Sequence, residues 1–179
     1  ISSKNKNITC LRFATACGFS PRLRLDLVLN DFVASAVVNK KIQILSNGLP
    51  WRPLIHIKDM SRALVWGANR DSSHGNFLTL NTGSNDWNYK IKDLAQAVKN
   101  KFENIEVEIN QNAEPDKRSY KVDFSLFSKL APQFTPKVNL DMAIDDLKTG
   151  LSKINFSDAN FRESKYIRLE ILKRHIIGE

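Results

Sequence analysis

The sequence contains few cysteines, glycines and prolines. Its two cysteines, Cys10 and Cys17, lie close together, and no second Cys/His pair follows at the spacing of metal ligands. This pattern indicates neither a disulfide framework nor a zinc site, and it makes a reducing cytoplasm the expected compartment. Seven glycines and six prolines are too few for a collagen-like chain or a flexible linker.

Long hydrophobic runs are also missing. Polar and charged residues such as Asp31, Asn39, Lys58 and Arg62 interrupt every apolar stretch well before the roughly 18 residues that a membrane-spanning helix needs. The 179 residues are instead 42% hydrophobic and 26% charged, which is typical of a globular domain. The net charge of +8 favours an anionic partner such as a phosphate, a nucleotide or a nucleic acid.

Several catalytic motifs do not occur. The sequence has no glycine-rich turn of the dinucleotide-binding or Walker type, no G-x-S-x-G elbow and no Cys-x-x-Cys pair. Its three tyrosines, Tyr89, Tyr120 and Tyr166, are not followed four residues later by lysine. We therefore predict no catalytic residue, no metal ligand and no cofactor-binding residue in this chain.

Hydrophobic periodicity predicts strands that alternate with helices, which is typical of an α/β fold. We expect Asp26, Asp59 and Asn88 to cap three of the helices. The predicted strands are 8–13, 42–45, 54–57, 77–81, 105–109 and 120–122. The predicted helices are 26–39, 59–69, 88–102, 125–131, 140–153 and 163–176.

Two groups of polar residues are candidates for binding an anion. Arg52 stands at the edge of an apolar strand, and a guanidinium suits bidentate phosphate recognition; the alternative is a surface arginine packed over Trp51. Asp116, Arg118 and Tyr120 could accept from ribose hydroxyls, hold a phosphate and stack, respectively, or could be ordinary loop residues.

Other polar residues suggest structural roles. Arg22 and Arg24 precede a predicted helix, where they could attract an anion or lie in a solvated loop. His56 lies within an apolar strand, where a hydrogen-bonded core histidine is commoner than a catalytic one. We do not predict that His56 is a catalyst.

The order of motifs resembles a known family. The segments that carry the resemblance are LRFATACG (11–18), ILSNG (44–48), WRPLIHIKDMSRA (51–63), LNTG (80–83), YKVD (120–123) and FTP (134–136). Together, between about Ile8 and Gly150, they resemble the C-terminal half of extended short-chain dehydrogenases, the NAD-dependent sugar-nucleotide epimerases and dehydratases.

This resemblance implies a fold and a domain organisation. The fold would be the C-terminal part of a Rossmann-type dehydrogenase, with its last parallel strands and a small substrate-binding α/β subdomain. Residues 1–7 would be a polar lead-in, 8–153 the Rossmann strands with the substrate-binding region, and 154–179 a helical extension. Because the sequence starts at Ile1 without an initiator methionine, we expect it to be part of a longer protein.

The resemblance also implies a function. The intact protein would be an NAD-dependent epimerase or dehydratase acting on a nucleoside-diphosphate sugar, through transient oxidation of a sugar hydroxyl. The NAD site and the catalytic Tyr/Lys pair would lie in an N-terminal domain, so this chain alone would be inactive. The resemblance further implies that the intact protein is a homodimer.

The family's substrate-binding positions can be transferred to this sequence. Arg52 matches the arginine that grips the substrate diphosphate. Gln43 and Leu45 fall on the strand that lines the nucleotide base, and Val28 falls on the neighbouring helix.

The loop of Asp116 and Tyr120 matches the one that contacts the nucleotide ribose and phosphate. Ala113 replaces a family arginine, so Arg118 could supply the second phosphate contact.

Some positions depart from the family pattern. Thr15, Cys17 and Phe19 replace the family's usual Asn, Tyr and Pro, so the identity of the sugar nucleotide is not fixed by the resemblance. Two alternatives remain: a nucleotide-binding relative without catalysis, and a stand-alone basic module that binds nucleic acid.

Overall fold

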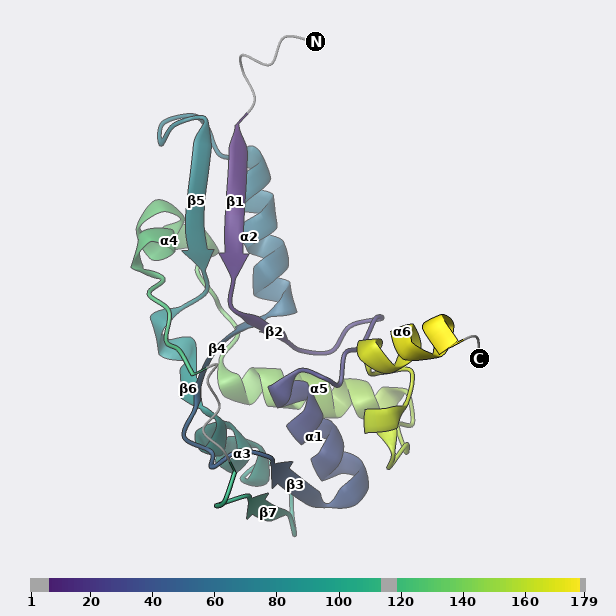
Figure 1. The fold of residues 1–179 in the computed structure, drawn as a ribbon. Helices are drawn as coiled ribbons and strands as arrows, with labels where there is room; N and C mark the ends of the chain where they lie inside the picture. The colour runs from purple at the N-terminus through teal and green to yellow at the C-terminus, as the bar shows by residue number, and fades with distance from the viewer. Residues whose placement is uncertain (1–6, 114–118, 178–179) are drawn as a thin grey trace.

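The computed structural model describes residues 7–113 and 119–177. Strands and helices alternate along most of this part of the chain (Figure 1). The strands are β1 (Ile8–Phe13), β2 (Thr15–Cys17), β3 (Lys41–Ile44), β4 (Trp51–His56), β5 (Phe77–Thr82), β6 (Asn88–Lys90) and β7 (Glu106–Ile109). The helices are α1 (Val28–Asn39), α2 (Ile57–Asn69), α3 (Ile91–Lys99), α4 (Ser125–Leu130), α5 (Leu140–Lys153) and α6 (Arg168–Ile177). The predicted α/β fold class is confirmed.

The described strands pair into three small sheets. Strand β1 is parallel to β5, with Ile8 opposite Phe77. Strand β4 lies between β2, to which it is parallel, and β6, to which it is antiparallel. Strand β3 pairs with β7 in parallel. The predicted strands at 42–45 and 105–109 therefore form one sheet, which local sequence could not reveal.

The largest hydrophobic core lies among α1, α3, α5 and β3. Apolar side chains recur at helical spacing in α3 and α5 and form one buried face on each, whereas α1 is buried on nearly all sides between Leu29 and Ala36. Fully burying a side chain of this size stabilises the fold by about 1.5–3 kcal/mol. The buried members include Leu29, Val33, Ile42, Leu94, Val98, Ile144 and Leu147.

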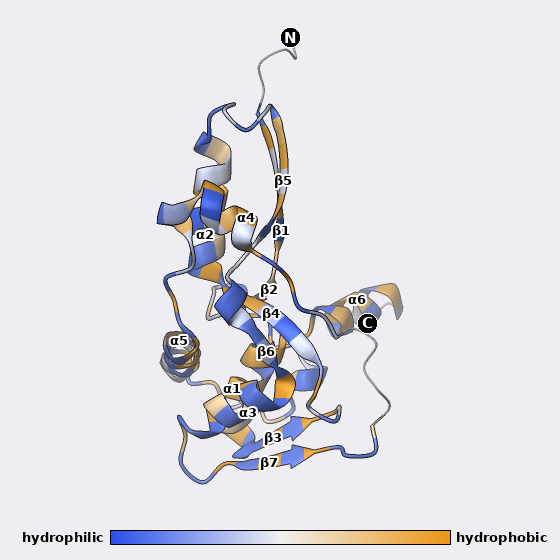
Figure 2. Cartoon of the chain, turned by 90° about the vertical axis from the view of Figure 1, so that its left-hand side faces the viewer, coloured by the Kyte–Doolittle hydropathy of each residue, from blue (hydrophilic) through white to orange (hydrophobic). Residues whose placement is uncertain are grey.

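A second core joins α2 and α4 to the β1–β5 sheet. Ala63 of α2, Leu80 of β5 and Phe127 of α4 are buried together. The rings of Trp66 and Phe127 meet edge to face, with 5.7 Å between their centroids. Both helices lie on the same side of the sheet (Figure 2).

The predicted helix caps are wrong because each side chain has a different partner. Asp26 binds the Arg24 guanidinium, and α1 starts after Leu27 without a side-chain cap. Asp59 lies inside the first turn of α2, whose cap is His56. Asn88 belongs to β6 and binds the backbone of Val122 through both side-chain polar atoms, at 3.0 and 3.1 Å.

The predicted strand at 120–122 is also wrong. Because Val122 bonds to the Asn88 side chain rather than to a neighbouring backbone, this extended segment does not join a sheet ladder. The last helix starts at Arg168, later than predicted, because residues 161–163 form a separate 3-10 turn.

Candidate functional site

The site begins at β4, which positions Arg52. The turn before β4 is fixed against the start of α3, because the carbonyl oxygens of Gly48 and Pro50 accept the Lys92 and Ile91 amides, each at 3.0 Å. Gly48 has a φ of +76°, and a Cβ atom there would lie 2.9 Å from the Lys92 Cβ atom, so the tight turn requires glycine. The start of β4 is therefore held rigidly.

The segment after residue 118 runs beside the start of β4. The Trp51 amide donates to the Ser119 hydroxyl at 3.1 Å, and the Tyr120 amide donates to the Trp51 carbonyl at 3.4 Å. These bonds place the Arg52 guanidinium carbon 5.7 Å from the centroid of the Tyr120 ring. Two predicted site residues that are far apart in the sequence are thus brought together.

The Arg52 side chain bonds to the backbone of Trp51 and contacts the Tyr120 ring. Its guanidinium donates to the Trp51 carbonyl at 2.8 Å, which turns it back along β4. The Trp51 ring is contacted by two other cations, Lys90 at 5.3 Å and Lys121 at 3.7 Å from the ring centroid. Tyr120 remains 48% exposed, so the Arg52–Tyr120 pair is accessible from solvent.

The other predicted site residues lie on different elements. Gln43 is exposed on β3, opposite Glu108 of β7, and Leu45 follows β3 with 72% of its surface exposed. Val28 is the first residue of α1 and packs partly against the main core. Asp116 and Arg118 lie outside the described residues. Their roles stay predictions.

A partly buried polar cluster, which the sequence did not predict, lies at the other end of β4. The Asp146 carboxylate on α5 accepts from the Lys58 ammonium at 2.8 Å and from the Phe19 amide at 3.0 Å. It also lies 3.2 Å from the Nε2 atom of His56. No local signal marks Asp146, because its partners come from two distant segments, at Phe19 and at residues 56–58.

The protonation states of this cluster follow from burial and hydrogen bonding. Burial lowers the pKa of His56, although the bond to Asp146 acts in the opposite direction. A neutral ring that donates from Nε2 to Asp146 can accept the Lys58 amide at Nδ1, which lies 3.2 Å away. Burial raises the pKa of Asp146, but the bonds from Lys58, Phe19 and His56 outweigh it and lower the pKa overall. The prediction that His56 is a hydrogen-bonded core residue is confirmed.

The Cys17 thiol beside this cluster is unsuited to nucleophilic chemistry. It is fully buried, and its pKa is raised by burial and by the nearby charges of Asp146 and Asp59. A thiol held in its neutral form is a poor nucleophile.

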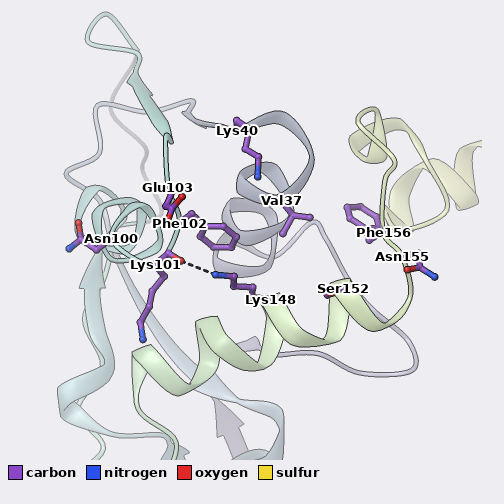
Figure 3. A pocket seen from close by; sticks show the side chains of 10 residues that line it. All are labelled: Val37, Lys40, Asn100, Lys101, Phe102, Glu103, Lys148, Ser152, Asn155 and Phe156. Atoms are coloured by element: carbon purple, nitrogen blue, oxygen red, sulfur yellow. Dashed lines mark hydrogen bonds between the residues drawn. The ribbon is translucent and has the colours of Figure 1, made fainter.

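A groove of about 750 Å³ opens between the end of α1, the turn after α3 and α5 (Figure 3). The Lys148 ammonium donates to the Lys101 carbonyl at 3.1 Å and lies over the Phe102 ring. Lys101 itself pairs with Asp145 at 3.1 Å. These contacts tie α5 to the turn after α3. None of the predicted site residues that the structure describes lines this groove.

Residues 7–113 and 119–177 contain no group of three or more His, Cys, Asp or Glu side chains that could hold a metal ion. Over the same ranges, none of the helices has the length and apolar character needed to span a membrane.

Comparison with known proteins agrees with this fold and these motifs. Residues 2–83 match the model of the NAD dependent epimerase/dehydratase family. The match covers β1 to β5 and includes Arg52. The resemblance seen in the sequence is thus confirmed over these residues.

Solved structures share the fold over a larger part of the chain. The NAD-dependent NDP-hexosamine 5,6-dehydratase TunA, of tunicamycin biosynthesis, is 18% identical, with a TM-score of 0.69 over 89% of this chain and 49% of its own. A UDP-glucose 4-epimerase is 19% identical, with a TM-score of 0.66 over 84% of this chain and 50% of its own. MoeE5, solved with UDP-glucose and NAD, is 19% identical, with a TM-score of 0.63 over 83% of this chain and 48% of its own. The chain therefore spans about half the length of these structures.

Proposed function

We propose that this chain is the substrate-binding half of an NAD-dependent nucleoside-diphosphate-sugar epimerase or dehydratase. The observation that carries the proposal is the Arg52–Tyr120 pair at the start of β4, where a guanidinium and an accessible phenol ring lie 5.7 Å apart. Arg52 lies within the segment that matches the family. Its charge and planar donors suit the diphosphate of a nucleotide sugar.

The contacts of Arg52 would orient it for this role. The bond to the Trp51 carbonyl and the ring of Tyr120 restrict the guanidinium, so less conformational entropy is lost when a diphosphate binds. The net charge of +8 would attract the anionic substrate. Asp116, Arg118, Gln43, Leu45 and Val28 remain proposed contacts to the nucleotide.

NAD is the cofactor that we propose for the intact protein, since the matched family is NAD dependent. The described residues of this chain do not fit a dinucleotide by themselves. Their glycines with positive φ, Gly18, Gly48 and Gly75, lie in three separate loops rather than in one glycine-rich turn before a helix. We therefore assign the NAD site and the catalytic Tyr/Lys pair to the other half of the fold, and to this chain only the positioning of the substrate.

The substrate class is supported by the matched structures. MoeE5 was solved with UDP-glucose and with UDP-glucuronic acid. A nucleoside diphosphate is the part that these ligands share, and it is the part that an arginine would recognise. We further propose a homodimer, as the family resemblance implies, and a cytoplasmic location, as the cysteine pattern indicates.

The proposal can be tested by calorimetric titration of UDP-glucose and UDP into the complete gene product. Replacing Arg52 by alanine should weaken binding of both ligands by about 1.5–3 kcal/mol, the scale of lost charged hydrogen bonds. Arg168→Ala, which removes an exposed arginine of α6, is the matched control and should leave affinity unchanged. Equal affinity of the Arg52→Ala variant, or tight binding of random oligonucleotides in place of UDP-glucose, would refute the proposal.

A further inference from the structure

The groove between the end of α1, the turn after α3 and α5 has the size and the lining of a ligand site. Its volume of about 750 Å³ lies within the roughly 300–1,000 Å³ of small-molecule pockets. Three lysines and one glutamate line it, together with amide, hydroxyl and apolar side chains. Neither Arg52 nor Tyr120 is among the lining residues, so this groove is a second candidate site.

Lys40 lines the groove from the end of α1, where its backbone is left-handed with a φ of +53°. Glycine is the usual residue in this conformation at a helix end, and asparagine occurs there at times. The other described non-glycine residues with positive φ are Asn104 and Asn155, so the lysine is the exception. Within residues 7–113 and 119–177, the Lys40 ammonium has neither a hydrogen-bond acceptor nor an ion-pair partner. A strained backbone that presents an unbonded charge is typical of a ligand site.

Lys148 lines the same groove from α5 (Figure 3). Its ammonium donates to the Lys101 carbonyl at 3.1 Å and lies 4.6 Å from the centroid of the Phe102 ring. Because an ammonium has three donors, this bond leaves two of them for a ligand. The same bond holds Lys148 in place, so this cation is oriented before a ligand arrives.

The other two charged residues of the groove differ from Lys40 and Lys148. Lys101 is paired with Asp145 at 3.1 Å, and its side chain points away from Lys148 in Figure 3. Glu103 is exposed, so solvent and salt screen its charge. A ligand in the groove therefore meets the two ammonium groups of Lys40 and Lys148, which attract an anion.

Apolar side chains form the floor of the groove. Phe156 is 9% exposed, and its ring meets those of Phe161 and Tyr166 with centroids 6.0 and 5.5 Å away. Val37 and Phe102 pack against the main core. Because these contacts fix the floor, the apolar part of a ligand can bind there without ordering the protein.

We propose that this groove binds a small phosphate monoester whose organic part is aromatic. The phosphate accepts from the ammonium groups of Lys40 and Lys148, and the ring lies on the floor formed by Phe102 and Phe156. A phosphate monoester carries a charge of about −1.5 to −2 at pH 7, which matches the two cations better than a single carboxylate does. The inference does not rest on the proposed sugar-nucleotide site, which lies at the start of β4.

Lysine acetylation of the complete gene product, followed by mass spectrometry, tests this inference residue by residue. The probe is phenyl phosphate, which combines a phosphate with one aromatic ring. It should protect Lys40 and Lys148 from acetylation, whereas Lys129, an exposed lysine of α4 that does not line the groove, should react as before. Inorganic phosphate should need an at least about tenfold higher concentration for the same protection, because it has no ring to bury against Phe102 and Phe156.

Lys40→Gly separates binding from folding, because it removes the ammonium and supplies the residue that the left-handed position favours. Its melting temperature should equal or exceed that of the wild type. The phenyl phosphate concentration that halves acetylation of Lys148 should nevertheless rise at least about tenfold, as expected for the loss of a charged hydrogen bond. Lys129→Ala is the matched control and should change neither quantity. Arg52→Ala should also leave the protection of Lys148 unchanged, since Arg52 lies outside the groove.

Three results would overturn the inference. Equal acetylation of Lys40 and Lys148 with and without millimolar phenyl phosphate would show that the groove does not bind the probe. Equal potency of inorganic phosphate would show that the aromatic floor plays no part. Protection that is kept in Lys40→Gly but lost in Arg52→Ala would show that the probe acts from the Arg52 site instead. Affinity for UDP-glucose enters none of these results, so this test and that of the proposed function fail independently.

Discussion

Removing the buried carboxylate of Asp59 should destabilise this fold. Its side chain is 1% exposed and accepts from the Arg62 guanidinium at 2.8 Å. It also accepts the amides of Lys137 and Val138, each at 3.1 Å. Arg62 in turn donates to the Thr135 carbonyl at 2.9 Å. Asp59 therefore ties the first turn of α2 to the segment before α5.

Replacing Asp59 by alanine leaves a guanidinium and two amides without their shared acceptor. Losing one partner of a buried charged pair costs about 3–5 kcal/mol, and leaving amides unpaired adds to this cost. We expect the free energy of unfolding to fall by at least about 3 kcal/mol, which for a chain of this size lowers the melting temperature by roughly 6–12 °C.

Urea denaturation followed by circular dichroism and by tryptophan fluorescence measures this change. Asp86→Ala, at an exposed aspartate of the 3-10 turn Asn85–Trp87, is the matched control and should change stability by less than about 0.5 kcal/mol. A loss below about 1 kcal/mol in the Asp59→Ala variant would refute the assigned role, because such a value fits a surface ion pair rather than a buried acceptor.

Three further predictions concern packing and protonation. The unfolded state binds a proton at His56 more readily than the folded state, so the free energy of unfolding should fall as pH drops below about 6.5, and it should fall further as Asp146 becomes protonated. Urea titrations at a series of pH values measure this profile, and His56→Gln should flatten its first part. An unchanged profile would contradict the buried neutral ring. Phe127→Ala should cost about 3–5 kcal/mol in denaturant midpoint experiments, because this ring is fully buried; a cost under about 1 kcal/mol would show that the second core is loosely packed. Gly18→Ala should lower the melting temperature, since residue 18 has a φ of +110° and a Cβ atom there would lie 2.4 Å from the His56 Nε2 atom; a wild-type melting temperature would contradict this packing.

Much of the fold could be predicted from periodicity. The first strand and the helix at 140–153 have the predicted bounds, because their apolar residues follow a clear strand or helix period. The caps could not be predicted in the same way. Asp59 and Asn88 stand where a helix cap is expected, yet they bond to the backbone of Val138 and Val122. A local sequence pattern does not reveal contacts between residues so far apart in the chain.

The candidate site, too, could be predicted only in part from the sequence. Arg52 and Tyr120 were each suggested by residue type and by the family resemblance, but their contact depends on the Ser119 segment running beside β4. Asp146 was missed because nothing in its neighbourhood distinguishes it from Asp145, an exposed residue of the same helix. Only the position of α5 beside Phe19, His56 and Lys58 shows which of the two joins the polar cluster.

The central claim is that Arg52 grips the diphosphate of a nucleotide sugar. A crystal structure of the complete gene product with UDP-glucose tests this claim most directly. We expect a diphosphate oxygen within about 3 Å of the Arg52 guanidinium, the distance of a charged hydrogen bond, with Tyr120 beside the nucleotide. A diphosphate bound elsewhere in the protein, with Arg52 still turned back onto the Trp51 carbonyl, would contradict the account.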